Sequence, residues 1–392
     1  MSLLSPGTRG LKALRSTNRR RLLDLLREHG EVSRADLARL TELSATTVSS
    51  LVAELADEGV VSEGGVDDHS RTGRTGRPAR LVRLVGGRGL VIALNLTREV
   101  VHAAVCDLSG AVVLECDRRI DVDRADSLTR IAALVDELAE QAGQAARERI
   151  SRLVVAVPGV VETSTGHVVS ARVPAWQQLA PGPVLAAATG LETHVENDAD
   201  LCALGERSFG AAVGLDDIAY VKASWGIGAG LVLGGRLYRG YHGGAGELGH
   251  MEVAEFGDLC LCGNRGCLET QASLETVLAA LRVVRPEVRT PADLAELVQA
   301  GDRAAIRAVT DAGAAIGRTV AALCNVLAPQ AVLVGGELAG GGTHLADSIR
   351  DAVERYTKPL TAERIVVLPA ELGSRAALLG AVATAVEAET TP

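Results

Sequence analysis

The chain has 392 residues, of which 47% are hydrophobic and 23% are charged, and it is too long for one ordinary domain. No apolar run approaches the roughly 18 residues that span a bilayer, and residues 1–21 lack the apolar core of a secretory signal, so we expect a cytoplasmic protein with no membrane partner. The net charge of −9 is uneven, since residues 1–85 hold 14 Lys and Arg against 11 Asp and Glu, and the remainder holds 26 against 38. Any nucleic-acid contact is therefore expected at the N-terminal end.

Three helices are predicted near the N-terminus. The first covers residues 18–28, where leucines recur at helical spacing. The second begins after Ser33, which with Asp36 has the spacing of a capping box. Ser44 is expected to cap the third helix. Its buried face carries apolar side chains at helical spacing, namely Val48, Leu51, Val52 and Leu55.

The start of the third predicted helix is rich in short polar side chains. A helix that enters the major groove needs such side chains at its N-terminal end, together with an apolar back face that holds it on the domain. The candidates for DNA contact on this helix are Ser44, Thr46, Thr47, Ser49 and Ser50. The alternative is an ordinary three-helix bundle, because Ser and Thr are also common helix caps.

Two short strands, at residues 60–61 and 81–85, are predicted around a glycine-rich loop. The loop carries four arginines, Arg71, Arg74, Arg77 and Arg80. A cationic loop between strands suits insertion along a minor groove or a phosphate backbone, and we expect the last three arginines to contact DNA. A solvated hairpin is the alternative for the loop alone. With the preceding helices, residues 1–85 predict a winged helix-turn-helix DNA-binding domain.

From residue 90 onward, apolar β-rich runs alternate with Ala- and Leu-rich helical segments, which is the α/β pattern. The runs that predict strands cover residues 90–94, 102–106, 111–115, 153–157, 218–223, 230–233, 331–334 and 365–368. They favour two α/β lobes, one formed by residues 86–195 and the other by residues 196–373. A final helix within residues 374–392 is expected to return to the first lobe.

One histidine and three cysteines form a candidate metal site, made of His250, Cys260, Cys262 and Cys267. One imidazole and three thiolates are a preferred ligand set of structural Zn²⁺. Fortuitous buried cysteines are the alternative, but thiols this close without a metal would be prone to oxidation. Four protein ligands leave no open position, so we expect one structural zinc per chain.

These segments resemble the ROK family, which is named for repressors, open reading frames and sugar kinases. The resemblance lies in a glycine-rich turn at residues 226–230, an acidic Gly-His segment at residues 240–250, and the cysteine cluster up to Glu269. Shorter matches stand at residues 157–159, 195–198 and 329–336. The resemblance implies an α/β fold, namely the two-lobed actin-like ATPase fold of sugar kinases, with a ligand held between the lobes.

By the same resemblance, a set of polar side chains corresponds to the sugar-contacting residues of the family, namely Asn197, Asp198, Glu247, His250 and Glu269. Carboxylates and amides suit vicinal hydroxyls, and Asp198 corresponds to the general base of the kinases. The alternative is that Glu247 and Glu269 only orient the zinc loop, and both roles are compatible.

The sequence departs from the kinases at three places. Kinases of the family open the first lobe with an Asp-x-Gly-Gly-Thr turn, whose glycines let the backbone approach the ATP phosphates. Here the segment Asn95–Arg98 lacks both glycines and the Asp. The bulky side chain of Leu96 is expected to obstruct the phosphates. Ser224-Trp225 replaces a Gly-Thr pair, and Arg172 stands where kinases usually carry a sugar-binding Asn. We therefore predict no enzyme activity and regard Asp198 as a vestigial base.

The combined expectation is a sugar-responsive transcriptional regulator, a repressor of carbohydrate-metabolism genes, which binds operator DNA and takes a sugar or sugar phosphate in the cleft. The family and the need for two half-sites imply a homodimer or homotetramer. One alternative is an ATP-dependent sugar kinase with an accessory DNA-binding domain. Another is a pseudokinase scaffold whose wing contacts a protein partner.

Overall fold

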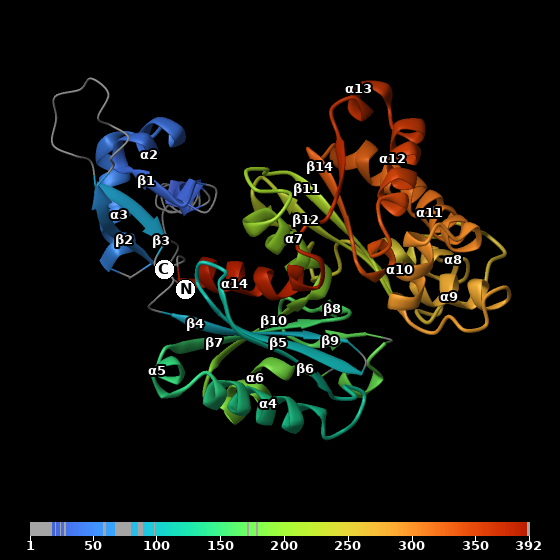
Figure 1. The fold of residues 1–392 in the computed structure, drawn as a ribbon, viewed down its shortest axis with the longest axis horizontal. Helices are drawn as coiled ribbons and strands as arrows, with labels where there is room; N and C mark the ends of the chain where they lie inside the picture. Colours follow the sequence, from blue (N-terminus) through green and yellow to red (C-terminus); the bar gives the residue numbers. More distant parts are fainter. Residues whose placement is uncertain are drawn as a thin grey trace, which may run out of the picture.

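The computed structural model describes residues 18, 19, 21–23, 25, 26, 29–57, 60–66, 80–84, 89–97, 99–170, 172–177 and 179–389. They form a small N-terminal unit and two larger α/β lobes (Figure 1). Among these residues, no helix is long and apolar enough to cross a membrane.

The N-terminal unit combines helices with a three-stranded sheet of order β1-β3-β2. Its elements are α2 (Arg34–Thr41), α3 (Ala45–Asp57), β1 (Glu31–Ser33), β2 (Val61–Val66) and β3 (Arg80–Leu84). Ser33 caps α2 by accepting a hydrogen bond from the Asp36 amide, and the Ser44 hydroxyl accepts one from the Thr47 amide at the start of α3. Both predicted caps are confirmed, and strand β1 is an element that the sequence did not predict.

The first lobe is built on a five-stranded sheet of order β10-β7-β4-β5-β6. Its strands are β4 (Leu90–Leu96), β5 (Val100–Asp107), β6 (Val112–Arg119), β7 (Ile150–Val157) and β10 (Glu192–Asn197). Strands β4, β5 and β6 pair antiparallel, whereas β7 and β10 run parallel to β4. One face is covered by α4 (Ser127–Gln141) and α6 (Pro181–Thr189), with α5 (Gln144–Arg147) at the edge (Figure 1).

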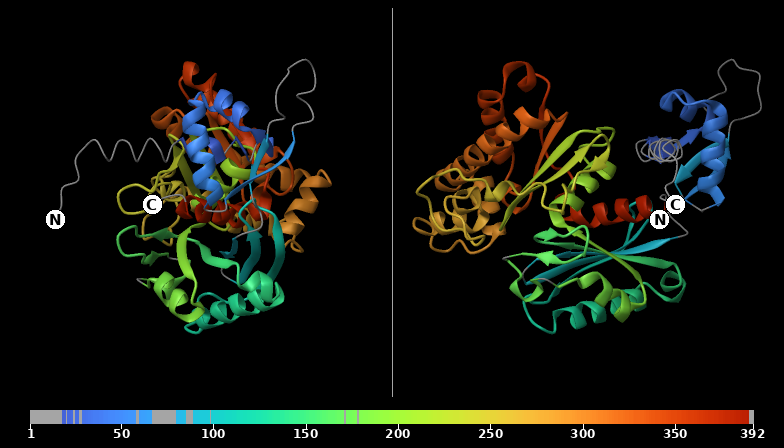
Figure 2. Two further views of the ribbon diagram at one scale, coloured as in Figure 1. Left: turned by 90° about the vertical axis from the view of Figure 1, so that its left-hand side faces the viewer. Right: turned by 180° about the vertical axis from the view of Figure 1, so that it is seen from behind.

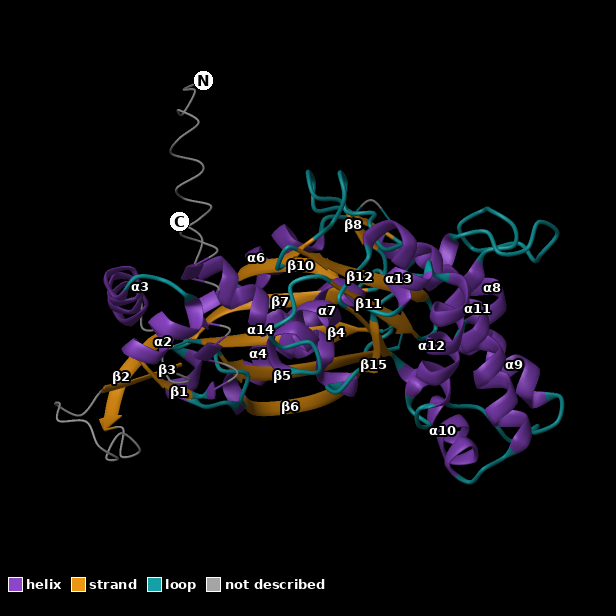
Figure 3. Cartoon of the chain, turned by 90° about the horizontal axis from the view of Figure 1, so that it is seen from above, coloured by secondary structure: helices purple, strands orange, loops and turns teal. Residues whose placement is uncertain are grey.

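The second lobe has a five-stranded sheet of order β13-β12-β11-β14-β15, with β11 in the centre. Its strands are β11 (Ile218–Ala223), β12 (Ile227–Leu233), β13 (Arg236–Leu237), β14 (Ala331–Gly335) and β15 (Val366–Pro369). Its helices are α8 (Leu268–Ala272), α9 (Leu274–Arg282), α10 (Pro291–Gln299), α11 (Arg303–Leu327), α12 (His344–Tyr356) and α13 (Pro359–Ala362). These helices lie at the end of the molecule opposite the N-terminal unit (Figure 3).

Two helices join the lobes. Helix α7 (Asp198–Phe209) packs on β11 and β12 of the second lobe, and α14 (Ala376–Glu389) packs on β4 and β7 of the first. The two helices also pack against each other between the sheets (Figures 1 and 2). Helix α14 therefore lies against the sheet of the first lobe. Strand β10 ends at Asn197, so the first sheet extends two residues past the boundary expected at residue 195.

The contact between α7 and α14 depends on two glycines. A Cβ on Gly380 would overlap the Leu201 carbonyl of α7, and a Cβ on Gly205 would overlap the Ala376 carbonyl of α14. The two backbones therefore touch without intervening side chains.

Replacing Gly380 by alanine is expected to destabilise the chain by about 2 kcal/mol or more, because the added methyl group forces two packed helices apart. The free energy of unfolding in urea measures the effect. Gly182→Ala in α6 is the matched control, since its Cβ would meet neighbours only at 3.6 Å, an ordinary contact. Equal stability of the two variants would contradict the close crossing.

Candidate functional site

The five predicted ligand-binding residues lie in elements of both lobes. Asn197 ends β10, and Asp198 begins α7. The other three lie in the second lobe: Glu247 precedes the 3-10 turn Leu248–His250, His250 ends that turn, and Glu269 lies in α8. Burial raises the pKa of the Glu247 carboxyl, and the charges of Glu269 and Asp198 raise it further, while His250 opposes them. The carboxylates of Asp198 and Glu269 therefore lie near enough to that of Glu247 to act on it.

Asn197 has a structural role in this site. Its side-chain oxygen accepts hydrogen bonds from the amides of Ala199 and Asp200, which caps α7. Its amide nitrogen donates to the Gly159 carbonyl at 2.9 Å. Both ends of the side chain are therefore used to hold the start of α7, and with it Asp198, against the first lobe.

Asp198 is bound to a lysine. Lys222 of β11 donates from Nζ to Asp198 Oδ2 at 2.5 Å, and both side chains are largely buried. Burial alone would lower the pKa of Lys222, but the charge of Asp198 raises it above its usual value. The carboxylate that corresponds to the kinase base is therefore neutralised by a fixed cation.

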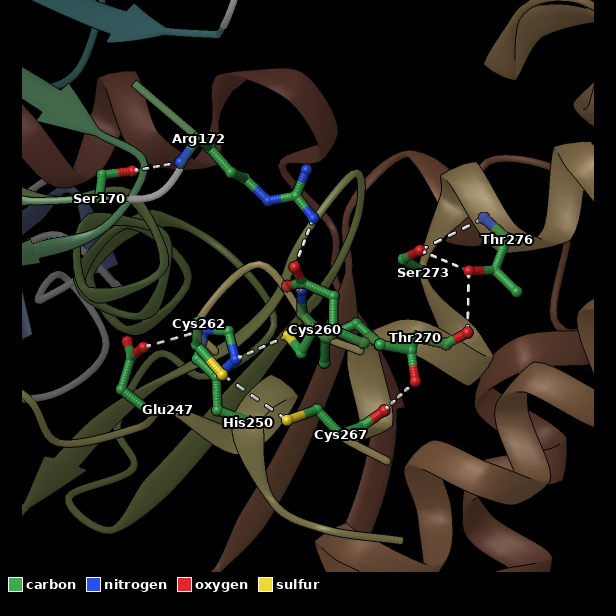
Figure 4. A network of polar contacts seen from close by, with 12 residues as sticks. Ser170, Arg172, Glu247, His250, Cys260, Cys262, Cys267, Thr270, Ser273 and Thr276 are labelled. Atoms are coloured by element: carbon green, nitrogen blue, oxygen red, sulfur yellow. Dashed lines mark hydrogen bonds and ion pairs between the residues drawn. The ribbon is translucent and has the colours of Figure 1, made fainter. Parts of the chain in front are cut away.

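Glu269 is bound to an arginine from the opposite lobe. Arg172 Nη2 donates to Glu269 Oε1 at 2.5 Å, and the Ile227 amide donates to Oε2 at 3.0 Å (Figure 4). Gly226 leaves room for this pair, since a Cβ there would lie 3.0 Å from Arg172 Nε and 3.1 Å from Glu269 Oε2. The segment that carries Arg172 is anchored by Trp176, whose indole is buried. The residue that departs from the kinase pattern thus forms an ion pair between the two lobes.

A second ion pair crosses between the lobes. Arg239 contacts Glu196 of β10, with Nη2 to Oε2 at 2.6 Å, and His194 lies 3.4 Å from the same oxygen. Burial alone would raise the pKa of Glu196, but the hydrogen bonds and charges of His194 and Arg239 lower it. Burial and the charge of Glu196 raise the pKa of neighbouring Asp200 well above its usual range. The site therefore contains more ion pairs than the sequence predicted.

Hydrogen bonds join Thr97 and Val100 in the segment that corresponds to the phosphate turn of the kinases. The Thr97 amide donates to the Val100 carbonyl at 2.9 Å, and the Val100 amide donates to the Thr97 hydroxyl at 3.1 Å. The Leu96 side chain is buried in the core of the first lobe, so the expectation that it stands in the path of the phosphates is wrong. The amides of Thr97 and Val100 are therefore already bonded within the turn.

The four predicted metal ligands converge in the second lobe. Their ligand atoms all lie within 4.8 Å of one another. His250 Nδ1 is 3.5 Å from Cys260 Sγ, and Cys262 Sγ is 3.8 Å from Cys267 Sγ (Figure 4). On its other side, His250 Nε2 lies 3.7 Å from Glu247. This group of side chains has the donor set and the spacing of a metal site.

The start of α3 presents the polar face that the sequence predicted. Ser44, Thr46 and Ser50 are exposed, Thr47 and Ser49 are partly exposed, and the apolar face of the helix is buried. The Ser44 hydroxyl is engaged as a cap. Of the three predicted wing contacts, Arg80 begins β3 and is exposed, whereas Arg74 and Arg77 lie outside the described residues.

Comparison with known families identifies both parts of the chain. The ROK family model matches residues 91–388, and a model described as winged helix-turn-helix DNA-binding matches residues 15–62. The chain belongs to the ROK family. A xylose repressor from Caldicellulosiruptor bescii is 28% identical over an alignment of 385 residues. The match covers 94% of this chain and 95% of that protein.

Two solved structures, one of a regulator and one of a kinase, match different shares of this chain. The crystal structure of a ROK family transcriptional regulator, a homologue of Escherichia coli Mlc, matches with a TM-score of 0.77 at 26% identity and covers 96% of this chain and 97% of its own. The ROK glucokinase of Streptomyces griseus matches with a TM-score of 0.66 at 26% identity and covers 98% of its own chain but 75% of this one. This ROK member therefore has the arrangement of the family's regulators, with a DNA-binding domain before the kinase-like lobes.

Sequence reasoning missed Lys222 and Arg239 as members of the site. A lysine within the apolar run of β11 was a usable signal for Lys222, because a buried ammonium needs a partner. No local pattern marks Arg239, whose partner Glu196 is 43 residues away.

Proposed function

We propose that the chain is a sugar-responsive transcriptional repressor of carbohydrate-metabolism genes that binds operator DNA and releases it when a sugar occupies the interlobe cleft. The observation that carries the proposal is a pair of kinase-like lobes attached to a DNA-binding domain, in which Lys222 binds Asp198 and the Thr97 and Val100 amides are bonded to each other's residues. Such a site retains hydroxyl-binding groups without the means to transfer a phosphoryl group.

The effector is bound by Asp198, Glu247, His250 and Glu269, while Asn197 holds the start of α7. These carboxylates accept hydrogen bonds from hydroxyl groups. The Arg172–Glu269 and Arg239–Glu196 pairs link the lobes, so a ligand that enters between them changes the angle of the lobes. The change reaches the N-terminal domain through α14, whose C-terminal end points toward that domain (Figure 2).

The metal is Zn²⁺, one per chain, held by His250, Cys260, Cys262 and Cys267. The donor set of three thiolates and one imidazole fits this ion. Its role is structural, because the four ligands fill a tetrahedral shell. With His250 in that shell, the metal fixes the ring that faces Glu247 and so orients one wall of the effector site.

The functional unit is a homodimer or homotetramer, in which two DNA-binding domains reach two half-sites. Residues 1–85 form the DNA-binding domain, residues 86–195 with 374–392 form the first lobe, and residues 196–373 form the second lobe, which contains the zinc site and the surface for oligomerisation. The contacts with DNA come from the start of α3 and from the wing that ends at Arg80.

Genome-wide capture of DNA with the purified chain tests the central claim. We expect enriched sites near genes of carbohydrate metabolism, and we expect a neutral sugar such as D-xylose or D-glucose to weaken binding to them. Absence of enriched sites would favour a scaffold whose wing contacts a protein.

Incubation with Mg-ATP and either sugar is expected to give no phosphorylated product, because the segment Asn95–Arg98 lacks the glycines of the phosphate turn and the Thr97 and Val100 amides are bonded within the turn. Product release is followed by coupled assay, with the solvent-exposed variant Arg307→Ala as a preparation control. Turnover at the usual kinase rate of about 1–100 s⁻¹ would refute the regulatory assignment of the cleft.

A further inference from the structure

Lys222 is a buried lysine in the central strand of the second lobe. Its neighbours in β11 are apolar and almost fully buried, and its own side chain is 18% exposed. Removing an ammonium from water is costly unless a partner and a hydrogen-bonding environment compensate. The position of Lys222 therefore requires an explanation beyond packing.

The Lys222–Asp198 pair leaves hydrogen-bonding groups unused. An ammonium has three N–H donors, and within the described part of the chain only Asp198 Oδ2 accepts one of them. Asp198 Oδ1 likewise receives no hydrogen bond from any described residue. The pair therefore presents two donors and one acceptor side by side, at the N-terminal end of α7 where the ligand-binding carboxylates meet.

A hydroxyl group is the ligand that suits this arrangement. A carboxylate alone can only accept from a hydroxyl, whereas the hydroxyl both donates and accepts. Lys222 supplies the donor and Asp198 the acceptor, so one hydroxyl is satisfied in both capacities. The charges of the pair offset each other, and an anionic group on the ligand would face the nearby carboxylate of Glu247. The chemistry favours an uncharged sugar over a sugar phosphate or a sugar acid.

We propose that Lys222 determines ligand specificity: its Nζ, together with Asp198, binds one hydroxyl of an uncharged sugar. This inference rests on the proposed function, because it names the hydroxyl-binding group and the effector class of the same cleft.

Titration calorimetry of the full chain with D-glucose, D-xylose and the monodeoxyglucoses tests the inference. For the sugar that binds the wild type, Lys222→Met is expected to weaken binding by about tenfold or more, the usual contribution of a charged hydrogen bond. One of the monodeoxyglucoses should bind the wild type about tenfold more weakly than glucose does. The same deoxysugar and glucose should bind Lys222→Met with equal affinity, because the missing hydroxyl and the missing ammonium are partners. Glucose 6-phosphate and glucuronate should bind the wild type more weakly than glucose.

The double variant Lys222→Met with Asp198→Asn separates a binding unit from a merely structural pair. If the pair acts as one unit, the double variant binds no more weakly than the weaker single variant. Lys358→Met at an exposed position is the matched control and should bind as the wild type does. If Lys222→Met does not fold, as judged by circular dichroism, Lys222→Gln replaces it with the same expectation.

Affinity and deoxysugar discrimination that Lys222→Met leaves unchanged would overturn the inference, as would tighter binding of glucose 6-phosphate or glucuronate than of glucose. The inference would also be overturned if the loss of affinity in the double variant equals the product of the losses in the two single variants. Operator release by an anionic sugar alone would sink the inference and leave the regulatory function standing. Sugar binding by a chain that captures no DNA would do the reverse, since the titration does not depend on DNA.

Discussion

Replacing Cys260 by serine is expected to reduce the bound zinc from about one equivalent per chain to well below that and to lower the stability of the chain by about 3 kcal/mol or more. The reason is that a structural zinc site contributes its binding free energy to folding, and a serine hydroxyl is a poor substitute for a thiolate. The cluster lies in the loop between β13 and α8. Among the described residues of this loop, the only β-type pairing is formed by two isolated bridges, Glu252↔Cys267 and Leu259↔Arg265. Metal analysis and thermal unfolding measure the two effects.

Cys116→Ser is the matched control for this experiment. Cys116 lies in β6 of the first lobe, is partly buried and is outside the cluster, so its replacement should leave the zinc content unchanged. A chelator should lower the unfolding temperature of the wild type and of Cys116→Ser alike, and should affect Cys260→Ser little. Full zinc retention by Cys260→Ser would show that the ligand set is different.

Replacing Arg74, Arg77 and Arg80 together by alanine is expected to weaken operator binding by at least about tenfold and to reduce the salt dependence of binding. Each phosphate contact that is lost removes about 0.9 from the slope of log K against log salt, so three contacts remove about 2.7. The loss should be similar on every captured site if the wing contacts the backbone. Fluorescence anisotropy at several salt concentrations measures both quantities.

Arg307→Ala provides the control for charge, because Arg307 is an exposed arginine of α11 in the second lobe, paired with Asp311. Replacing Arg307 removes one positive charge, as does each single wing replacement. The slope of log K against log salt should nevertheless stay near the wild-type value. A triple wing variant with an unchanged slope would exclude the wing from the DNA interface and restrict the contact to α3.

Much of the chain could be predicted because its signals are local. The caps at Ser33 and Ser44, the apolar runs of β4, β7, β11 and β14, and the cysteine spacing each depend on residues close in sequence. Strand β10 was missed because its residues Glu192–Asn197 include charged and polar side chains, and only its parallel pairing with β7 makes it a strand. Its register cannot be inferred from its own composition.

The sequence by itself determined the family, the DNA-binding segment and the four side chains of the candidate metal site, since motifs and spacings carry that information. The tertiary structure alone decided which charged side chains of the site are paired. Lys222 and Asp198 are 24 residues apart, and Arg172 and Glu269 are 97 residues apart in different lobes. Whether a carboxylate faces water, a sugar or a cation depends on which side chains the packed sheets bring within about 3 Å of it, a distance that no linear pattern specifies.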